Sequence, residues 1–398
     1  MSRRQATMFD GVRMTMQDSI DLTVQSLLAY SGVYRHWAIA YSGGKDSSTL
    51  VSLILWLIAN GKIPAPETLT VLYSDTLLEL PPLHMGAIET LKTVQRMGYS
   101  AKIVLPEMDD RFFVYMLGRG VPPPNNQTLR WCTPQIKVEP MLTALSALRD
   151  EHGEKFLMLT GVRVGESAAR DARIALSCGR NGAECGQGWF QETTPDSIAD
   201  TLAPLLHWRV CHVWDWLMFD APAIIPSVSM VAQVYGGEEA EEINARTGCM
   251  GCPLAEKDTA LDHVLTIPEW SYLSPLKRLR PLYRELRKFI HRKQKDGERN
   301  ADGQYSSNPS RKGPLTLDAR KWGLDQVLEI QRDINDEATL RGRPEMWLID
   351  GVQEARIREL IALRTYPQRW SDADPDATVL IPQTYQSGDV QAILPGLA

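Results

Sequence analysis

The sequence has no long apolar run and no hydrophobic segment close behind its first residues. Its longest apolar stretch, from Leu50 to Ala59, is too short to span a bilayer, which takes about 20 residues. Residues 1–7 carry charge but lead into no apolar segment of the kind that a signal peptide contains. We therefore expect no membrane partner and a cytoplasmic location.

Cysteine is scarce as well. The 398 residues include six cysteines, and residues 253–398 include none. Few cysteines in a large cytoplasmic chain do not predict a disulfide framework. The spacing of these cysteines therefore needs another explanation.

A general excess of positive charge is also absent, because the net charge is −6. This balance argues against a protein coated in basic surface. One stretch differs: Lys277 to Arg299 holds ten Lys and Arg residues against three acids. Such a run can follow a nucleic-acid backbone, dock an acidic partner, or form a solvated helix face, and the sequence leaves these readings open.

The length exceeds that of one typical domain, so we expect a core domain with an appendage. We predict an N-terminal helical segment at 1–34, a nucleotide-binding domain with the cysteines at 35–255, and a mostly helical region at 256–398. The first segment is amphipathic, and its expected core contacts are Ile20, Leu22, Val24, Leu27 and Leu28.

Short apolar segments alternate with helical ones in the predicted core domain. The expected strands are 36–40, 69–73, 101–105 and 155–160, and the expected helices between them include 48–58 and 82–97. This alternation predicts an α/β fold with a mostly parallel sheet covered on both faces. Ligands of such sheets bind beyond the carboxyl ends of the strands. The segments 42–48, 74–76 and 161–163 all fall at such ends.

The segment from Tyr41 to Ser48 reads Tyr-Ser-Gly-Gly-Lys-Asp-Ser-Ser between a predicted strand and a predicted helix. Gly43 and Gly44 allow a tight turn and a close approach of a phosphate to the backbone. The first amides of the helix then point at the anion, and the helix dipole adds favourable potential. The spacing is not that of a Walker A loop, which needs four residues between its glycine and its Gly-Lys-Ser/Thr.

Ser-Gly-Gly-Lys-Asp-Ser resembles the pyrophosphatase loop of N-type ATP pyrophosphatases. The resemblance implies an adenine-nucleotide α-hydrolase-like (PP-loop) fold, in which the loop holds the departing pyrophosphate of ATP while AMP is transferred. The implied nucleotide ligands are Ser42, Gly43, Gly44, Lys45, Asp46, Ser47 and Ser48. Asp46 is suited either to bind Mg²⁺ or to cap the helix N-terminus.

Further segments resemble phosphoadenosine-phosphosulfate-reductase-like proteins, a branch of the same superfamily. They are Ser74-Asp75-Thr76, Arg130 to Pro140 around Cys132, Gly161 to Arg170, and Pro204 to Leu217, which looks like a closing strand and helix. The resemblance covers roughly residues 35–260. It implies that Asp75, Arg163 and Arg170 bind the nucleotide. For Arg170 a surface ion pair with Glu166, four residues earlier, is equally open.

Within that branch, Arg246 to Leu254 resembles the sulfurtransferases of DNA phosphorothioation, of the DndC and SspD types. The resemblance implies that ATP activates a DNA backbone phosphate and that sulfur from a cysteine desulfurase replaces a non-bridging oxygen. DNA and other phosphorothioation proteins are then expected partners. DndC proteins tend to carry a further cysteine shortly before Cys-x-x-Cys, and residues 212–248 contain none.

Cys249 and Cys252 form a Cys-x-x-Cys pair without the second pair that a zinc ribbon needs. With Cys132 and one more cysteine they suit a [4Fe–4S] cluster, which takes four thiolates. The fourth ligand is Cys185 or Cys178, and we favour Cys185. The rival interpretation is that Cys132, Cys249 or Cys252 carries sulfur as a persulfide, while Cys211 reads as a core thiol.

The function predicted from these motifs is an ATP-dependent sulfurtransferase with ATP pyrophosphatase activity, in which Lys45, Asp46 and Arg163 are catalytic. Its cofactors are ATP, Mg²⁺ and a [4Fe–4S] cluster. Reduction of adenylyl sulfate or its phosphorylated form is a competing function, but such reductases typically use a cysteine in a C-terminal tail. Thiolation of tRNA and a role as a regulatory ATP-binding subunit stay open as well.

Overall fold

The computed structural model describes residues 14–125, 129–165, 171, 189–191, 198–235, 249–255, 257–295, 312–377, 382–384 and 389–392. The helices are α1 (Met16–Tyr30), α2 (Lys45–Ala59), α3 (Pro81–Arg96), α4 (Glu139–His152), α6 (Val210–Asp215), α7 (Ser229–Tyr235), α8 (Thr259–Val264), α9 (Leu279–Leu286), α10 (Leu317–Leu340) and α11 (Gly351–Ala362). The strands are β1 (His36–Tyr41), β2 (Thr68–Ser74), β3 (Ser100–Val104), β4 (Phe156–Leu159), β5 (Trp189–Gln191), β6 (Ala199–Ala203), β7 (Arg292–Gln294), β8 (Lys312–Leu315), β9 (Pro382–Thr384) and β10 (Val390–Ala392). None of the helices in the described part has the length and apolar character needed to cross a membrane.

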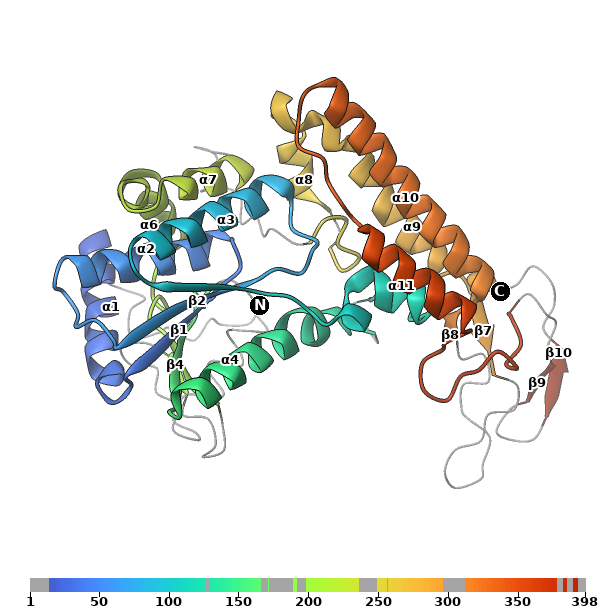
Figure 1. The fold of residues 1–398 in the computed structure, drawn as a ribbon, viewed down its shortest axis with the longest axis horizontal. Coiled ribbons are helices and arrows are strands. Elements are labelled where there is room, and N and C mark those ends of the chain that lie inside the picture. Colours follow the sequence, from blue (N-terminus) through green and yellow to red (C-terminus); the bar gives the residue numbers. More distant parts are fainter. Residues whose placement is uncertain are drawn as a thin grey trace, which may run out of the picture. The chain divides into compact units, whose positions relative to one another are not determined.

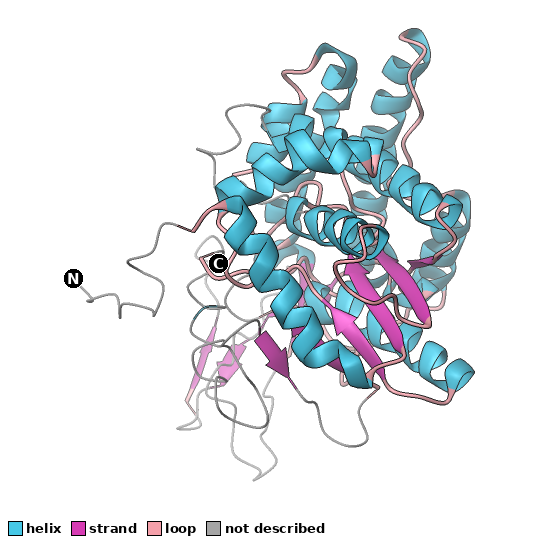
Figure 2. Cartoon of the chain, turned by 90° about the vertical axis from the view of Figure 1, so that its left-hand side faces the viewer, coloured by secondary structure: helices cyan, strands magenta, loops and turns pink. Residues whose placement is uncertain are grey.

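The main sheet has the strand order β3-β2-β1-β4-β6-β5. Five strands pair in parallel, and β5 runs antiparallel, against β6 at the edge. The parallel strands lie side by side in Figure 2. The predicted fold class, a parallel sheet flanked by helices with a mostly helical C-terminal part, is confirmed.

Both faces of the sheet are covered because its strands are apolar on both sides. Helix α4 packs on one face, and α2 and α3 lie on the other (Figure 1). The core under α4 is made by Ala38, Leu72, Val104, Leu145, Leu148 and Phe156. Such two-sided burial is what near-continuous apolar strands require, since an exposed face would leave those side chains in water.

The structure corrects three details of the sequence prediction. The last parallel strand is β6 at Ala199–Ala203, so the closing strand predicted at Pro204 to Trp208 is wrong, and those residues turn toward α6. Helix α2 begins at Lys45, three residues earlier than predicted. On α1, Leu28 is exposed, whereas the polar Ser19, Thr23 and Ser26 are buried.

The chain divides into two compact units, each built from separate segments. The first comprises Met1–Ser74, Pro82–Val104 and Met141–Ala245 and holds the sheet. The second comprises Asp75–Pro81, Leu105–Pro140 and Arg246–Ala398 and holds the C-terminal helices. In the second unit α10 contacts both α9 and α11. The domain boundaries predicted at 34 and 255 stay a prediction.

Candidate functional site

The turn predicted to bind an anion lies in the first unit, at the carboxyl end of β1. Gly43 adopts φ +72°, a left-handed conformation that side chains disfavour, and Gly44 is the N-cap of α2 without any side-chain cap hydrogen bond. The turn is braced from within, because the Ser47 hydroxyl donates to the Gly44 carbonyl (3.0 Å) and accepts from the Ser42 amide (3.2 Å). Gly44 thus leaves the N-terminus of α2 without a side-chain cap, and the assignment of this turn to a phosphate stays a prediction.

Charged side chains surround this helix N-terminus. Asp46 lies in the first turn of α2, and its carboxylate accepts from Arg163 Nε at 2.5 Å and lies 3.1 Å from Lys45 Nζ. Arg163 also donates through Nη1 to the Trp208 carbonyl (3.1 Å). Lys45 Nζ stands 5.4 Å from the ring centroid of Tyr235. Arg163, which is distant in sequence, thus joins Lys45 and Asp46 in one cluster, in which Lys45 and Arg163 are buried and Asp46 is partly buried.

Gly161 explains how β4 approaches the turn so closely. A Cβ at this position would lie 2.8 Å from the Asp46 carbonyl oxygen and 3.0 Å from the Ser47 amide nitrogen. Real Cβ atoms do not come that close to backbone, so only glycine allows the end of β4 to pack on the first turn of α2. The sequence motif assigned Gly161 no role of its own.

The remaining predicted nucleotide ligands are Ser48, Asp75 and Arg170. Ser48 is fully buried in α2, while Asp75 belongs to the second unit, where its Oδ1 accepts from the Leu77 amide at 2.8 Å. Leu77 has φ +62°, and this hydrogen bond holds the strained residue in place. Arg170 and its alternative partner Glu166 lie outside the described residues.

The second unit holds the Cys-x-x-Cys turn. The Cys252 amide donates to the Cys249 carbonyl (3.0 Å), the Met250 amide donates to the Leu78 carbonyl (2.7 Å), and the Gly251 amide donates to Asp258 Oδ2 (3.1 Å). These three bonds fix the turn on both sides. Both cysteines are half-buried and free of disulfides, as are Cys132 and Cys211. Cys185 and Cys178 lie outside the described residues.

A polar group that the sequence did not predict adjoins Cys249. Thr76 donates its hydroxyl proton to Glu79 Oε1 (2.7 Å), and its Oγ1 lies 4.0 Å from Cys249 Sγ. Because Thr76 has only one hydroxyl proton, the Cys249 thiol is the donor in that contact. Burial raises the pKa of Cys249 to about 11, and burial likewise raises the pKa of Glu79 to about 7. The Lys137 ammonium opposes both shifts.

These residues fit a thiolate-held group by their chemistry. Cys249 raises the pKa of Lys137 most, and Cys132 and Cys252 add to the rise. The Lys137 ammonium therefore interacts electrostatically with all three cysteines. The Tyr283 hydroxyl is buried with no hydrogen-bond partner among the described residues, and burial and both turn cysteines raise the pKa of Tyr283. A thiolate or sulfide would accept a hydrogen bond from this hydroxyl. No group of three or more His, Cys, Asp or Glu side chains within the described residues is arranged to hold a metal ion.

Most cations of the basic run are engaged inside the second unit. Arg278 pairs with Glu329 and Asp333, and Lys293 Nζ lies 3.1 Å from Asp376 Oδ1. Arg280 donates to the Ala255 carbonyl. The further pairs are Lys277 with Asp262, Lys288 with Glu285, Lys295 with Asp374, and Arg292 with the Gly313 carbonyl. Arg292 and Lys293 are buried and Arg278 is partly buried, whereas Lys277 and Lys288 form their pairs on the exposed surface.

The chain is similar to one known protein family. The family model of the phosphoadenosine phosphosulfate reductase domain matches residues 36–235, about half of the chain. The chain belongs to this family, and this membership indicates an enzyme. Helix α1 and the Cys-x-x-Cys turn lie outside the matched residues. No curated protein matches the chain in sequence.

Several solved structures resemble parts of the chain. A phosphoadenylyl-sulfate (PAPS) reductase from Candida auris, in a phosphate complex, is 14% identical with a TM-score of 0.32, over 53% of this chain and 89% of that one. The U34-tRNA thiolase NcsA from Methanococcus maripaludis, with its [4Fe-4S] cluster, is 15% identical with a TM-score of 0.33, over 57% and 77%. Candida glabrata FMN adenylyltransferase, in complex with FMN and the ATP analogue AMPCPP, is 20% identical with a TM-score of 0.31, over 51% and 56%.

Proposed function

We propose that the protein is an ATP-dependent sulfurtransferase of DNA phosphorothioate modification. The observation that carries the proposal is the helix N-terminus of α2, which has no side-chain cap and is flanked by Lys45 and Arg163. The positive end of a helix dipole together with two cations suits a polyphosphate. The DndC-like and SspD-like sequence around Cys249 and Cys252 supports sulfur transfer to DNA.

In the first step, a non-bridging oxygen of the DNA phosphate attacks the α-phosphorus of ATP. The bond between the α-phosphorus and the bridging oxygen breaks, and pyrophosphate leaves on the turn at 42–48. The amides of that turn and the two cations would stabilise the charge that builds up on the leaving group. Asp46 would fix both cations by its contacts with Lys45 and Arg163 and would reach Mg²⁺ directly or through water.

In the second step, sulfur at the sulfide level attacks the activated DNA phosphorus, and AMP leaves with the oxygen. A cysteine desulfurase would supply the sulfur as a persulfide, and a dithiol reductant would release it at the sulfide level and itself become a disulfide. Cys132, Cys249, Cys252 and either Cys185 or Cys178 would hold a [4Fe–4S] cluster, which would supply redox-active iron beside the reaction. Lys137 would balance the charge of the thiolates, and Tyr283 would donate a hydrogen bond to one of them.

The test measures pyrophosphate release from MgATP by the whole protein with DNA and a cysteine desulfurase, and phosphorothioate dinucleotides in digests of that DNA. Asp46→Asn should lower pyrophosphate release by about 100-fold, since catalysis of phosphoryl transfer depends on electrostatic positioning. The matched control is Asp109→Asn, which breaks a comparable pair in the second unit, where Asp109 accepts two 2.7 Å bonds from Arg356.

The outcomes separate the candidate functions. Pyrophosphate release that Asp46→Asn abolishes and Asp109→Asn spares, with sulfur in the DNA, supports the proposal. Thiolated tRNA in place of thiolated DNA would assign the same chemistry to another nucleic acid. Formation of sulfite from adenylyl sulfate without any release of pyrophosphate from ATP would identify a reductase and overturn the proposal.

A further inference from the structure

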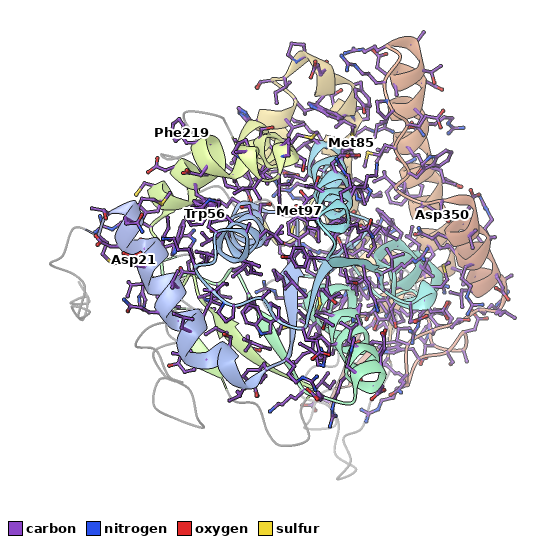
Figure 3. The ribbon with its side chains drawn as sticks, turned by 60° about the vertical axis from the view of Figure 1, so that its left-hand side comes forward. Asp21, Trp56, Met85, Met97, Phe219 and Asp350 are labelled. Carbon is purple, nitrogen blue, oxygen red and sulfur yellow. The ribbon has the colours of Figure 1, made fainter. Side chains whose placement is uncertain are left out.

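Helix α1 buries a polar face in the first unit. Ser19, Thr23 and Ser26 recur at intervals of three or four residues and are each 1% exposed or less. The opposite face, which includes Asp21, labelled in Figure 3, is exposed to solvent. Hydrophobic burial alone would favour apolar residues on the inner face, and two of the three, Ser19 and Thr23, make side-chain hydrogen bonds there.

The hydrogen bonds of this face converge on Trp208. The Trp208 indole N–H donates to the Thr23 hydroxyl (2.9 Å) and to the Ser19 carbonyl (3.2 Å). The Thr23 hydroxyl lies 3.0 Å from the Ser19 carbonyl and 3.1 Å from the Pro204 carbonyl, and it can donate a hydrogen bond to either of them. Ser19 Oγ also lies 2.9 Å from His212 Nδ1, so α1 is joined to both ends of the segment 204–212.

Trp208 continues toward the nucleotide site through its backbone. Its carbonyl accepts from Arg163 Nη1 at 3.1 Å, and Arg163 Nε donates to Asp46 Oδ1 at 2.5 Å. Because the guanidinium is planar and rigid, bonds at Nε and Nη1 fix its whole plane. An unbroken series of contacts thus runs from α1 through Trp208 and Arg163 to the first turn of α2.

We propose that α1 is a positioning element of the nucleotide site and that Trp208 is the positioning residue through which it orients Arg163. The inference rests on the proposed function, in which Arg163 acts on the phosphates of ATP. It adds a helix that lies outside the residues of the family match. Without the α1 hydrogen bonds the Trp208 backbone would shift, and Arg163 would lose its fixed orientation toward Asp46.

The experiment compares Trp208→Phe and Thr23→Val with two matched controls in the whole protein. Ser26→Ala removes a buried hydroxyl of α1 that has no partner among the described residues, one turn from Thr23. Trp37→Phe removes another indole hydrogen bond, which Trp37 donates to the Tyr34 carbonyl at 3.1 Å. The controls match the helix and the residue type, but neither lies in the series that reaches Arg163.

We expect both test variants to lower kcat for pyrophosphate release by about tenfold, with KM for MgATP changed less than twofold, because displacement of a charge-stabilising group acts on the transition state. The loss should vanish in an Arg163→Lys background, since the positioned group is then already altered. Equal kcat losses in the Trp37→Phe control, or losses that add fully to Arg163→Lys, would mean a purely structural role and overturn the inference.

Hydrogen exchange gives a readout that needs no turnover. Trp208→Phe and Thr23→Val should speed amide exchange in peptides covering 42–49, and Ser26→Ala should leave it unchanged. If the unaltered protein releases no pyrophosphate, the proposed function fails, but this arm still reports on the link from α1 to the turn. Unchanged exchange at 42–49 in both test variants refutes the inference whatever the activity.

Discussion

At the scale of single residues, Glu79 gives the second unit a dependence on pH. Its carboxylate accepts from the Thr76 hydroxyl (2.7 Å), the Thr76 amide (3.1 Å) and the Leu78 amide (3.2 Å), yet burial still raises its pKa from the ordinary value of 4.5 to about 7. The folded state therefore binds a proton that the unfolded state has lost between these two pH values. Folding stability should fall as the pH rises from 4.5 to 7.

Glu79→Gln should remove this dependence. Relative to the unaltered protein, the variant should gain stability as the pH rises from 4.5 to about 7, so that its unfolding free energy becomes comparatively larger, because the amide cannot ionise. Chemical denaturation at several pH values measures the difference. Glu89→Gln is the control, since Glu89 is exposed and its pKa is lowered by Lys92, so its variant should show no such gain. A pH-independent difference for Glu79→Gln would contradict the assignment.

Gly161 makes a second prediction about a single residue. In Gly161→Ala the new Cβ must displace backbone at Asp46 or Ser47, which lies 2.8–3.0 Å away. We expect a loss of about 1–3 kcal/mol in unfolding free energy and at least about a tenfold fall in pyrophosphate release. Gly32→Ala is the control, because nothing lies within 4 Å of its Cβ position. Equal behaviour of the two variants in thermal unfolding and turnover would refute the close-packing argument.

The sequence predicts part of this detail and misses the rest for a physical reason. Residues 42–48 form a contiguous motif, so their site could be predicted locally. Glu79 reads in the sequence as an ordinary loop acid, and its burial depends on the turn at Cys249, which lies far along the chain. Gly161 begins the segment that resembles the family motif, Gly161 to Arg170. Its packing role depends on how closely β4 approaches α2, and only the three-dimensional structure shows that distance.

At the scale of elements, apolar segments with strong β propensity indicated the first four strands to within about two residues. The closing strand, which a family resemblance placed at Pro204 to Trp208, instead lies at β6, whose sequence Ala-Asp-Thr-Leu-Ala has little apolar character. Strand formation at β6 depends on its pairing with β4 and β5, a tertiary effect that local pattern does not capture.

Helix α9 and its C-cap provide the prediction at this scale. Arg287 donates to the Pro253 carbonyl (3.3 Å) and to the Pro123 carbonyl (3.4 Å), so it braces the chain just after Cys252. Arg287→Met should loosen this turn and speed alkylation of Cys252 in the metal-free protein severalfold, because two buried acceptors lose their donor. Mass spectrometry of the Cys252 peptide follows the rate.

Arg284→Met is the matched control on the same helix, because Arg284 is exposed. Its alkylation rate should equal that of the unaltered protein. If the basic run instead tracks nucleic acid through its free charge, Arg284→Met and Arg287→Met would reduce the salt dependence of DNA binding equally and leave alkylation unchanged.

At the scale of the whole molecule, the family domain at 36–235 does not coincide with a folding unit. Residues 105–140 belong with 246–398, and single contacts show why. Phe112 packs edge-on against Tyr283 at 5.7 Å, and the fully buried Arg320 donates to the Leu117 carbonyl at 2.8 Å. Removing the C-terminal segment would leave these apolar side chains and carbonyls without partners.

A chain of residues 1–245 should therefore fail to fold as an independent domain. We expect it to bind a hydrophobic dye and to lack a single cooperative thermal transition, because unpaired buried carbonyls and exposed aromatic side chains both disfavour the compact state. Coexpression with residues 246–398 is the control and should restore a cooperative transition, since the missing side chains return in trans. A cooperative, dye-free 1–245 chain would instead show that residues 105–140 need no partner, and the two units would then be separable along the sequence.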